Sequence, residues 1–469
     1  MLLLLLSLFF FTNTCAGQTT ISAGHATPFL THDNLNVKKS ISQATKIHPL
    51  PKTQEQFKDE SRNESSWKLN LLHRDELPFS NFTDFGGRFQ SRMKRDSHRV
   101  ADLIRRTSGL EYEAEELGAE VVSAWNLGIM EYVVRIGVGT PPQYQFLVID
   151  TGSNIMWVQC QPCNKCYSQY YPVFDPTRSA SFAIVPCSST ICDLIHLGCN
   201  RDRCMYWVKY IDGSYTNGTM VFETIIFGGT MVRDMAIGCG QTNHGSFTGI
   251  SGLLGLAGGS TFMGQLFPQT GGVFSYCLAT WGTDSSGSLE FGQKAIPVGA
   301  VWVPLLRSVQ APTTYYIGLS GLGVGGIKLP ISEDVFRLTE QGLGGVIMDT
   351  GTTVTRLPKV AYVALRDTYM MQTATLPRAP GAFVFDTCYN LYGLGTVQVP
   401  TVSFFLIGGP VWTIATKNVL IPVDNRGTFC FAFAPSTTGI SIIGNIQQEG
   451  IQISIDSSNG FVGFGPNNC

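Results

Sequence analysis

A short motif occurs twice in this chain, each time at the end of an apolar run, and it narrows the folds open to the sequence. The first copy, Phe-Leu-Val-Ile-Asp-Thr-Gly-Ser, covers residues 146–153, and the second, Val-Ile-Met-Asp-Thr-Gly-Thr, covers residues 346–352. A carboxylate at the end of a buried strand is costly unless its charge or its proton is stabilised. One copy would fit an ordinary turn after a strand. Two copies in matched contexts predict two half-sites that meet, around Asp150 and Asp349.

A second repeat accompanies the first. Leu-Leu-Gly at 253–255 ends 105 residues after Asp150, and Ile-Ile-Gly at 442–444 ends 95 residues after Asp349. Because Gly in a strand permits close backbone approach, each of these strands is expected to pack under the neighbouring Asp loop. The chain is therefore predicted to contain two copies of one β lobe.

The chemistry of such an arrangement follows from the charges. Two carboxylates brought close together share a proton, so that one acts as a base and the other as an acid. This pair suits the hydrolysis of an amide by water. The sequence therefore predicts that Asp150 and Asp349 are catalytic.

The body of the chain after Glu131 consists of short runs rich in Val, Ile, Phe and Tyr, separated by Gly, Pro, Asn and Ser. These runs predict strands at 132–138, 146–149, 220–227, 315–319 and 452–456. Helix signals are few, and the best covers 359–371. We expect an all-β fold with few helices.

The segment before this body is different. Residues 18–117 hold 15 Lys+Arg and 14 Asp+Glu, whereas the longer stretch 118–469 holds only 17 and 20. A body so poor in Lys and Arg is not an electrostatic candidate for nucleic acid binding. Up to about Asn63 the segment is polar, and we expect it to be poorly ordered. A basic helix is predicted at 86–107, with its apolar residues near one face.

Two interpretations of this helix are open. It is either part of a propeptide that covers an acidic cleft until acid releases it, or a solvated linker helix. Since a chain that hydrolyses amides must be kept silent until it is needed and the charge signs are complementary, we favour the propeptide, with maturation between about residues 107 and 130.

The start of the chain predicts entry into the secretory pathway. Residues 1–17 are almost continuously apolar and then small, as in a signal peptide; a retained signal anchor is the alternative. Removing this segment leaves twelve of the 13 cysteines, an even number suited to disulfide bonds. Asn63, Asn81 and Asn217 each begin an Asn-X-Ser/Thr glycosylation acceptor.

Over about residues 130–469 the sequence resembles the pepsin-like aspartic proteases. The resemblance rests on both Asp-Thr-Gly loops, both aliphatic-aliphatic-Gly strands, Trp157, and Tyr210 in Tyr-Ile-Asp-Gly-Ser. It implies a bilobal pepsin-like fold with the active site in the cleft between two related β lobes. Asp150 and Asp349 would hold the attacking water between them, and no acyl-enzyme would form.

The resemblance also implies roles for the residues around the aspartates. Thr151 and Thr350 would cross-bond the two loops. Gly152 and Gly351 would bring backbone N–H groups to the carboxylates.

Hydroxyls and a flap complete the implied site. Ser153 and Thr352 would donate hydroxyl groups to the aspartates. Tyr210 would cover the substrate from a β-hairpin flap, with its phenol bonded to the Trp157 indole. The family usually has Gly after the flap Tyr, and this chain has Ile211. A β-branched residue stiffens the hairpin, so flap opening or subsite shape is expected to differ.

The resemblance is stronger still to the plant nepenthesin-like branch, and within it to the group named aspartic protease in guard cell. The residues that support it include Trp-Val-Gln-Cys-Gln-Pro-Cys-Asn-Lys-Cys at 157–166 and Gly-Cys-Gly at 238–240. Sequence spacing alone leaves the pairing of the cysteines open. The branch pattern implies the bonds Cys160–Cys163, Cys166–Cys239, Cys187–Cys204, Cys192–Cys199, Cys277–Cys469 and Cys388–Cys430.

The resemblance gives a domain organisation. Residues 1–17 would be the signal peptide and 18–117 a propeptide with the basic helix. The N-terminal catalytic lobe would cover 118–310, with a cysteine-rich insertion at 158–204, and the C-terminal catalytic lobe would cover 311–469.

Other chemistries have weaker support. Cys160, Cys163 and Cys166 have a spacing also found in metal and iron–sulfur sites, but a ferredoxin-type run needs a further Cys at the position of Tyr170. Gly-x-Gly-x-x-Gly at 321–326 has no following helix and predicts a hairpin rather than a dinucleotide site. There is no Gly-x-Ser-x-Gly motif, and the chain has only seven His. We predict no metal and no cofactor.

The alternative function is a catalytically silent protein-binding or inhibitor relative of the same fold. The intact loops favour an enzyme. We predict a monomeric acid endopeptidase that acts on protein or peptide substrates and is inhibited by its own propeptide. It would be secreted to the apoplast or kept in an endomembrane compartment such as the ER or vacuole. After signal removal it would have no membrane or nucleic acid partner.

Overall fold

A computed structural model describes most of the chain, namely residues 20–22, 31–46, 67–77, 84–108, 131–194, 198–210, 214–245, 247, 249–279 and 287–465. The predicted signal peptide 1–17, the acceptors Asn63 and Asn81, the flap residue Ile211 and the terminal Cys469 lie outside the described residues.

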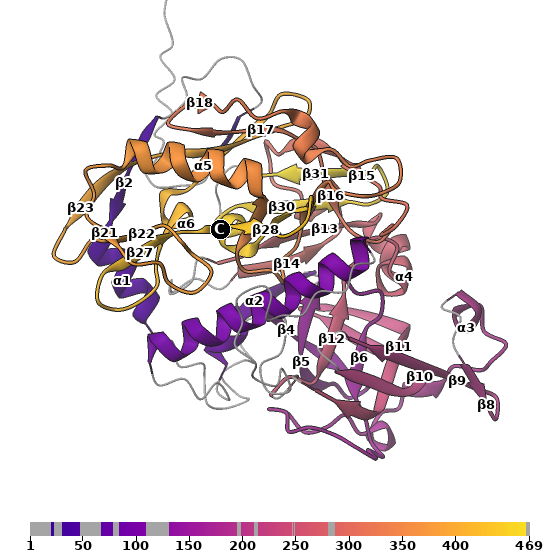
Figure 1. The fold of residues 1–469 in the computed structure, drawn as a ribbon. Helices are drawn as coiled ribbons and strands as arrows, with labels where there is room; N and C mark the ends of the chain where they lie inside the picture. Colours follow the sequence, from indigo (N-terminus) through magenta and orange to yellow (C-terminus); the bar gives the residue numbers. More distant parts are fainter. Residues whose placement is uncertain are drawn as a thin grey trace, which may run out of the picture.

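The molecule is built mainly from β-strands in two lobes, which confirms the predicted fold class (Figure 1). Four of the five predicted strands are found in full or extended, and three of these are β4 (Tyr132–Val138), β5 (Gln143–Asp150) and β30 (Gln452–Asp456). The predicted strand at 220–227 belongs to the longer β10 (Tyr215–Phe227). The fifth is divided into β16 (Tyr316–Ile317) and β17 (Leu319–Val324), because the chain changes sheets there.

The N-terminal lobe is formed around β4, β5 and β10. Its other strands are β6 (Trp157–Gln159), β7 (Ala183–Ile184), β8 (Gly198–Asn200), β9 (Arg203–Lys209), β11 (Thr230–His244) and β12 (Gly252–Gly255). Its helices are α3 (Thr190–Leu194) and α4 (Thr261–Thr270). Figure 1 shows α3, β8 and β9 projecting from this lobe.

A continuous set of strand pairs joins the two lobes, in the order β15–β31–β30–β13–β14–β3–β4. The strands not yet introduced are β3 (Lys68–His73), β13 (Val273–Cys277), β14 (Gly287–Phe291), β15 (Val301–Leu306) and β31 (Phe461–Phe464). The N-terminal segment thus contributes β3 to this sheet.

Besides β23 (Thr396–Pro400), which pairs with a strand of the N-terminal segment, the described part of the C-terminal lobe contains three further groups of strands. β16, β19 (Val346–Met348), β20 (Thr355–Pro358), β28 (Phe433–Ser436) and β29 (Ser441–Ile443) surround the second Asp loop. A five-stranded sheet has the order β1 (Thr20–Ser22), β25 (Val411–Ile414), β24 (Val402–Leu406), β17 and β18 (Ile327–Lys328). A third sheet contains β21 (Arg378–Ala379), β22 (Cys388–Asn390), β27 (Thr428–Phe431) and β26 (Leu420–Pro422).

Helices of the C-terminal lobe are α5 (Lys359–Gln372), α6 (Thr416–Val419) and α7 (Asn445–Gln448). The first confirms the helix predicted at 359–371. The pair β17–β18 is antiparallel, so the Gly-rich stretch 321–326 is a hairpin as predicted.

The N-terminal segment is more ordered than predicted. Residues 20–22 form β1, and β2 (His32–Asn36) is followed by α1 (Val37–Thr45), so the expectation of a poorly ordered stretch up to Asn63 is wrong for these residues. The predicted basic helix is α2 (Phe85–Ser108), which runs between the two lobes (Figure 1). Of the helices within the described ranges, none has the length and apolar character needed to cross a membrane.

The disulfide pairing differs from the prediction. The structure has Cys160–Cys239, Cys163–Cys166, Cys187–Cys199, Cys192–Cys204 and Cys388–Cys430, so Cys160–Cys163, Cys166–Cys239, Cys187–Cys204 and Cys192–Cys199 were wrong. Among the predicted pairs whose two cysteines are both described, Cys388–Cys430 is the one that agrees. Cys277 is disulfide-bonded, but its predicted partner Cys469 is outside the described residues.

Strand register explains the corrected pairs. β6 lies parallel to β11, and the Cys160 amide donates to the Gly240 carbonyl at 3.0 Å, which places Cys160 beside Cys239. Cys199 and Cys204 face each other across the β8–β9 pair, so the position of α3 decides their partners. Cys192 packs with Cys204 in one buried cluster, which leaves Cys199 for Cys187.

Candidate active site

The first Asp loop follows β5, whose last six residues are buried. Strand β12 runs parallel to β5, with Gly255 in register with Asp150. A Cβ on Gly255 would lie 2.5 Å from the Ser153 carbonyl oxygen, so Gly is needed there, as predicted. Asp150 Oδ1 accepts from the Gly152 amide at 2.9 Å, and Oδ2 accepts from the Ser153 hydroxyl.

The second loop has the same construction. Strand β29 runs parallel to β19, with Ile443 in register with Met348, and a Cβ on Gly444 would lie 2.6 Å from the Thr353 carbonyl oxygen. Asp349 Oδ2 accepts from the Thr352 hydroxyl at 2.7 Å. The repeated sequence motif therefore gives repeated local geometry.

The two aspartates, called here the Asp pair, converge on one cation. Arg99 of α2 donates from Nη2 to Asp150 Oδ1 at 2.9 Å and to Asp349 Oδ1 at 2.6 Å. Its Nε donates to Asp349 Oδ2 at 2.9 Å. Asp150 is 1% exposed, Asp349 2% and Arg99 0%. Two carboxylates from different lobes thus lie close enough to share a single nitrogen atom.

The electrostatics of Asp349 reflect this contact. Burial by itself raises the pKa of its carboxyl, but the Arg99 guanidinium and the Thr352 hydroxyl and amide outweigh burial and hold the pKa below its usual value. Burial also opposes the charge of Arg99, but the two aspartates raise the pKa of the guanidinium well above its usual value. The three groups therefore form one buried ion cluster.

Two contacts that the family resemblance implies are absent from the described part of the chain. They are the bond from Thr350 to the opposite loop and the bond from the Gly351 amide to a carboxylate. Thr151 Oγ1 reaches Asp349 Oδ1 at 3.5 Å, but the buried Thr350 hydroxyl has no hydrogen-bond partner there. The Thr350 carbonyl instead accepts from the Asn445 side chain at 3.0 Å. The Thr352 amide, rather than that of Gly351, stabilises the second carboxylate. A Cβ on Gly351 would lie 2.9 Å from Arg99 Nε, so this Gly gives the guanidinium room.

The predicted flap contact is present. Tyr210 follows β9, its amide donates to the Ser214 carbonyl at 2.7 Å, and the Trp157 indole donates to its phenol oxygen at 3.0 Å. Phe247 was not identified from the sequence, yet its ring packs edge-on against both aromatics, at 5.2 Å from Trp157 and 5.5 Å from Tyr210. The three rings hold the base of the hairpin in place.

Comparisons with known proteins agree with this geometry. A family model described as xylanase inhibitor N-terminal matches residues 132–293, and one described as xylanase inhibitor C-terminal matches residues 314–466. Protein ASPARTIC PROTEASE IN GUARD CELL 2 of Arabidopsis thaliana is 56% identical over 422 residues, which cover 88% of this chain and 89% of that protein. The chain belongs to the pepsin-like aspartic proteases.

Other relatives place it among the plant members of that family. Aspartic proteinase nepenthesin-2 of Nepenthes gracilis is 40% identical over 346 residues, covering 72% of this chain and 78% of that protein. Solved structures share the fold at lower identity. The crystal structure of edgp has a TM-score of 0.59 at 20% identity and covers 72% of this chain and 91% of its own. Conglutin gamma from lupine seeds has a TM-score of 0.56 at 20% identity, with 72% and 92% covered.

In this pepsin-like chain, α2 contacts both Asp loops besides the Asp pair. Arg106 Nη1 donates to the Gly152 carbonyl at 2.6 Å in the first loop. Asp96 Oδ1 accepts from the amides of Thr353 and Val354 in the second loop, at 2.8 and 2.9 Å. The helix therefore lies directly over the site.

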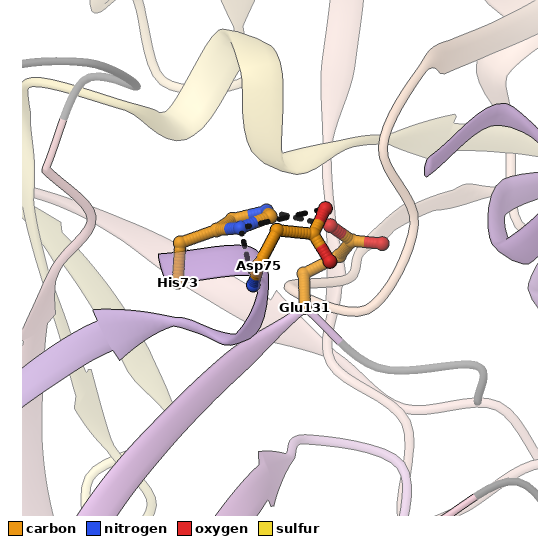
Figure 2. Close-up of side chains that lie close together, drawn as sticks. All are labelled: His73, Asp75 and Glu131. Atoms are coloured by element: carbon orange, nitrogen blue, oxygen red, sulfur yellow. Dashed lines mark hydrogen bonds and ion pairs between the residues drawn. The ribbon is translucent and has the colours of Figure 1, made fainter. Parts of the chain in front are cut away.

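A second ion cluster fixes the middle of α2. Arg95 donates to Asp75 Oδ2 at 2.6 Å and to Glu131 Oε1 at 2.7 Å, and His73 Nε2 lies 2.7 Å from Glu131 Oε2. Figure 2 shows His73, Asp75 and Glu131 pointing toward one another. These residue types also bind metals. Here Arg95 already supplies the positive charge between the two carboxylates. Despite burial, Arg95 and His73 hold the pKa of Glu131 well below its usual value.

The sequence contained a signal for these contacts. Arg88, Arg92, Arg95, Arg99 and Arg106 are spaced by 4, 3, 4 and 7 residues, which places them on one side of a helix. All but Arg106 are at most 2% exposed. Buried arginines require acidic or carbonyl partners, so the stripe itself indicates a docked helix. Which arginine meets the aspartates depends on the position of the helix along the cleft.

Space remains beside the Asp pair. A cavity of about 170 Å³ is bordered by Asp349 and Gly152 of the two loops and by Leu103 and Arg106 of α2. The helix side chains thus form one wall of the space next to the carboxylates.

Proposed function

We propose that this chain is the precursor of an acid endopeptidase in which Asp150 and Asp349 activate water to hydrolyse peptide bonds. The observation that carries the proposal is the convergence of both carboxylates on one nitrogen of Arg99. A position within hydrogen-bond distance of both carboxylates is where an attacking water must lie. Buried carboxylates at such proximity share one proton.

The reaction follows from that shared proton. The ionised carboxylate accepts a proton from water, and the water oxygen attacks the scissile carbonyl carbon. The protonated carboxyl donates its proton to the carbonyl oxygen, which gives a tetrahedral diol without a covalent bond to the protein. The carboxyl that took the water's proton then donates it to the amine nitrogen, and a diol hydroxyl returns its proton to the other carboxylate as the C–N bond breaks. The starting protonation of the pair is thereby restored. Ser153 and Thr352, each bonded to one aspartate, orient the two carboxyl groups.

Residues 18–117 act as the propeptide in this proposal. Arg99 occupies the position that the water needs, and α2 covers both loops, so the uncut chain is inactive. Support comes from the complete burial of Arg99 and from the contacts of Arg106 and Asp96 with the loop backbones. Cutting between about residues 107 and 130, followed by departure of α2, would open the site.

The substrate would be an extended peptide with bulky apolar residues, covered by the flap of Tyr210. The Trp157–Tyr210 contact supports this role. Secretion is supported by five disulfide bonds among the described residues and by the apolar residues 1–17. Asn217, which is half-buried on β10, is the one described acceptor for a glycan. We expect a monomer that needs no metal or cofactor.

The second candidate is a catalytically silent relative. It is favoured by the description of the matching family models as those of a xylanase inhibitor. Retention of both aspartates with their Gly, Ser and Thr partners favours an enzyme.

One assay separates the two. Acid-treated protein should cleave a denatured protein substrate at pH 3–5, and pepstatin or Asp150→Asn should abolish cleavage. Asp367→Asn is a matched control, because Asp367 is exposed on α5. An acid-processed wild-type protein without peptidase activity would favour the silent relative.

A further inference from the structure

A strand near the start of the chain completes a strand of the C-terminal lobe. β2 pairs antiparallel with β23 (Thr396–Pro400) over five residue pairs, from His32 with Pro400 to Asn36 with Thr396. These two strands form a sheet of their own, and within the described ranges β23 has no other ladder partner. A strand without a partner leaves a row of N–H and C=O groups unpaired. Residues 32–36 supply that missing pairing.

The side chains of β2 alternate as expected for a strand that covers a core. His32, Asn34 and Asn36 are exposed, whereas Asp33 and Leu35 are buried. Leu35 is 2% exposed and belongs to the main core cluster, together with Val397 and Val399 of β23. Val37, the first residue of α1, is 1% exposed in the same cluster.

Polar contacts fix the register at both ends of β2. Thr401 donates its amide to the Thr31 carbonyl at 3.1 Å, and Val37 donates its amide to the Gly395 carbonyl at 3.0 Å. The buried Asp33 accepts from the Thr416 hydroxyl at 2.8 Å. The C-terminal lobe therefore binds one polar side chain, Asp33, and one apolar side chain, Leu35, at alternate positions of β2.

A short helix completes the contact. Asn36 caps α1 by accepting from the Lys39 amide at 2.9 Å, and the buried Ala44 lies near the other end. Arg88 of α2 donates to the Ala44 carbonyl at 2.5 Å, where the helix dipole favours a cation. Residues 31–46, called here the docking arm, thus contact the lobe directly and meet α2 at their end.

We propose that the docking arm binds the C-terminal lobe as a separate module, at an interaction surface formed by the edge of β23, Thr416 and the core beneath them. Strand addition to a free edge, with pockets for alternate side chains, is a general mode of peptide recognition. The occupant of this surface is residues 31–46 of the chain itself, whether or not they remain covalently joined to the rest. The inference rests on the proposed function only for the assignment of residues 18–117 as a propeptide.

The test separates the docking arm from α2. A recognition site for an added protease is placed between residues 47 and 66 of the full chain, and the cut protein is analysed by size-exclusion chromatography. The N-terminal fragment, which contains residues 31–46 and ends at the cut, should elute with the body in the wild type and with Asn34→Asp. With Leu35→Asp it should be released, through a loss of affinity of at least about 30-fold. The two substitutions add the same charge at neighbouring positions, one exposed and one buried.

A second measurement tests independence from the Asp pair and does not require the substituted chain to fold. A labelled synthetic peptide of residues 31–46 is exchanged onto the cut wild-type protein, with and without saturating pepstatin. It should bind equally in both cases. The unlabelled Asn34→Asp peptide should compete with it, and the Leu35→Asp peptide should not.

Several results would overturn the inference. They are release of the wild-type fragment on cutting, equal behaviour of the two substitutions, absence of peptide exchange at roughly 1 mM, or displacement of the peptide by pepstatin. None of these readouts measures peptidase activity. An acid-processed protein that lacks peptidase activity but retains its docking arm would count against the proposed function alone.

Discussion

The helix α2 and the docking arm belong to the same N-terminal segment, yet different forces hold them on the body. α2 buries a row of arginines against acidic side chains, including Arg99 on the Asp pair and Arg95 on Glu131. The docking arm is held by a strand ladder and by the burial of Leu35 and Val37. Charge pairs depend on protonation, whereas a ladder and apolar contacts do not. The comparison therefore indicates that acid can release one part and leave the other in place.

The largest effect is expected where the charge contact is removed. Arg99→Gln leaves the Asp pair buried without its cation, a change that typically costs about 3–5 kcal/mol. We expect the uncut chain to gain peptidase activity by about 100-fold or more, and amide hydrogen exchange to accelerate in residues 85–108. Arg105→Gln is the matched control, because Arg105 is exposed on the same helix. An uncut Arg99→Gln chain that stays inactive and fully protected would contradict the role of this contact.

The second-largest effect is expected from acidification, which should open α2 and leave the docking arm in place. Asp349 and Glu131 have pKa values below the usual 3.8 and 4.5 in the folded chain. The stability they contribute is present above those usual values and is lost as pH falls through the lower folded values. Asp102 acts in the opposite sense, because burial raises its pKa. Hydrogen exchange of α2 should therefore accelerate below about pH 4.

The docking arm should respond differently in the same experiment. Its only carboxyl group is that of Asp33, and its ladder does not titrate. Exchange protection of residues 32–37 should persist at a pH where α2 has opened. Loss of protection in both regions at one pH would show that they are not separate.

An apolar truncation should affect only the docking arm. Leu35→Ala removes a buried side chain and is expected to cost about 2–4 kcal/mol of local stability. Exchange of residues 32–37 should accelerate, while exchange of α2 and the latency of the uncut chain stay unchanged. Lys38→Ala provides the exposed control on the neighbouring helix. Activation of the uncut Leu35→Ala chain would indicate that the docking arm and α2 are coupled.

The smallest effect is expected from one hydrogen bond. Thr416→Val removes the donor to Asp33 and should weaken the docking arm by about 1–2 kcal/mol. Peptide exchange, as described for residues 31–46, measures this change. Asp33→Asn keeps an oxygen acceptor and should lose less affinity. If Asp33→Asn and Thr416→Val lower the affinity equally, Asp33 contributes through its charge.

The two parts of the N-terminal segment also differ in how well sequence predicted them. The basic helix was predicted at 86–107 and extends over 85–108, because its arginines and apolar residues recur at helical spacing. The docking arm was missed. Its strand, His-Asp-Asn-Leu-Asn, has a single apolar residue, and the partner that makes it a strand lies more than 350 residues away at β23. Pairing over such a distance leaves no local pattern.

The rest of the chain shows the same difference between features with a local pattern, which the sequence predicted, and features that depend on distant partners, which it did not. Both Asp loops and both Gly positions beneath them follow from short motifs, because each depends on a repeated local geometry. The Trp157–Tyr210 contact joins residues 53 apart and was expected only from the family resemblance. Four disulfide pairings were wrong because the register of β6 against β11 and the position of α3 beside β8 and β9 decide the partners, and neither can be read from cysteine spacing. Phe247 was missed since an aromatic residue in a strand-rich chain carries no distinguishing pattern.

The sequence by itself determined the duplicated β lobe, the two aspartates at buried strand ends and a cationic helix preceding them. Local turn chemistry and the burial of apolar strands are sufficient for these features. Only the tertiary structure decided which arginine lies on the Asp pair, which cysteines bond and which strand covers β23. Those choices depend on contacts between segments far apart in the chain, which leave no local pattern in the sequence.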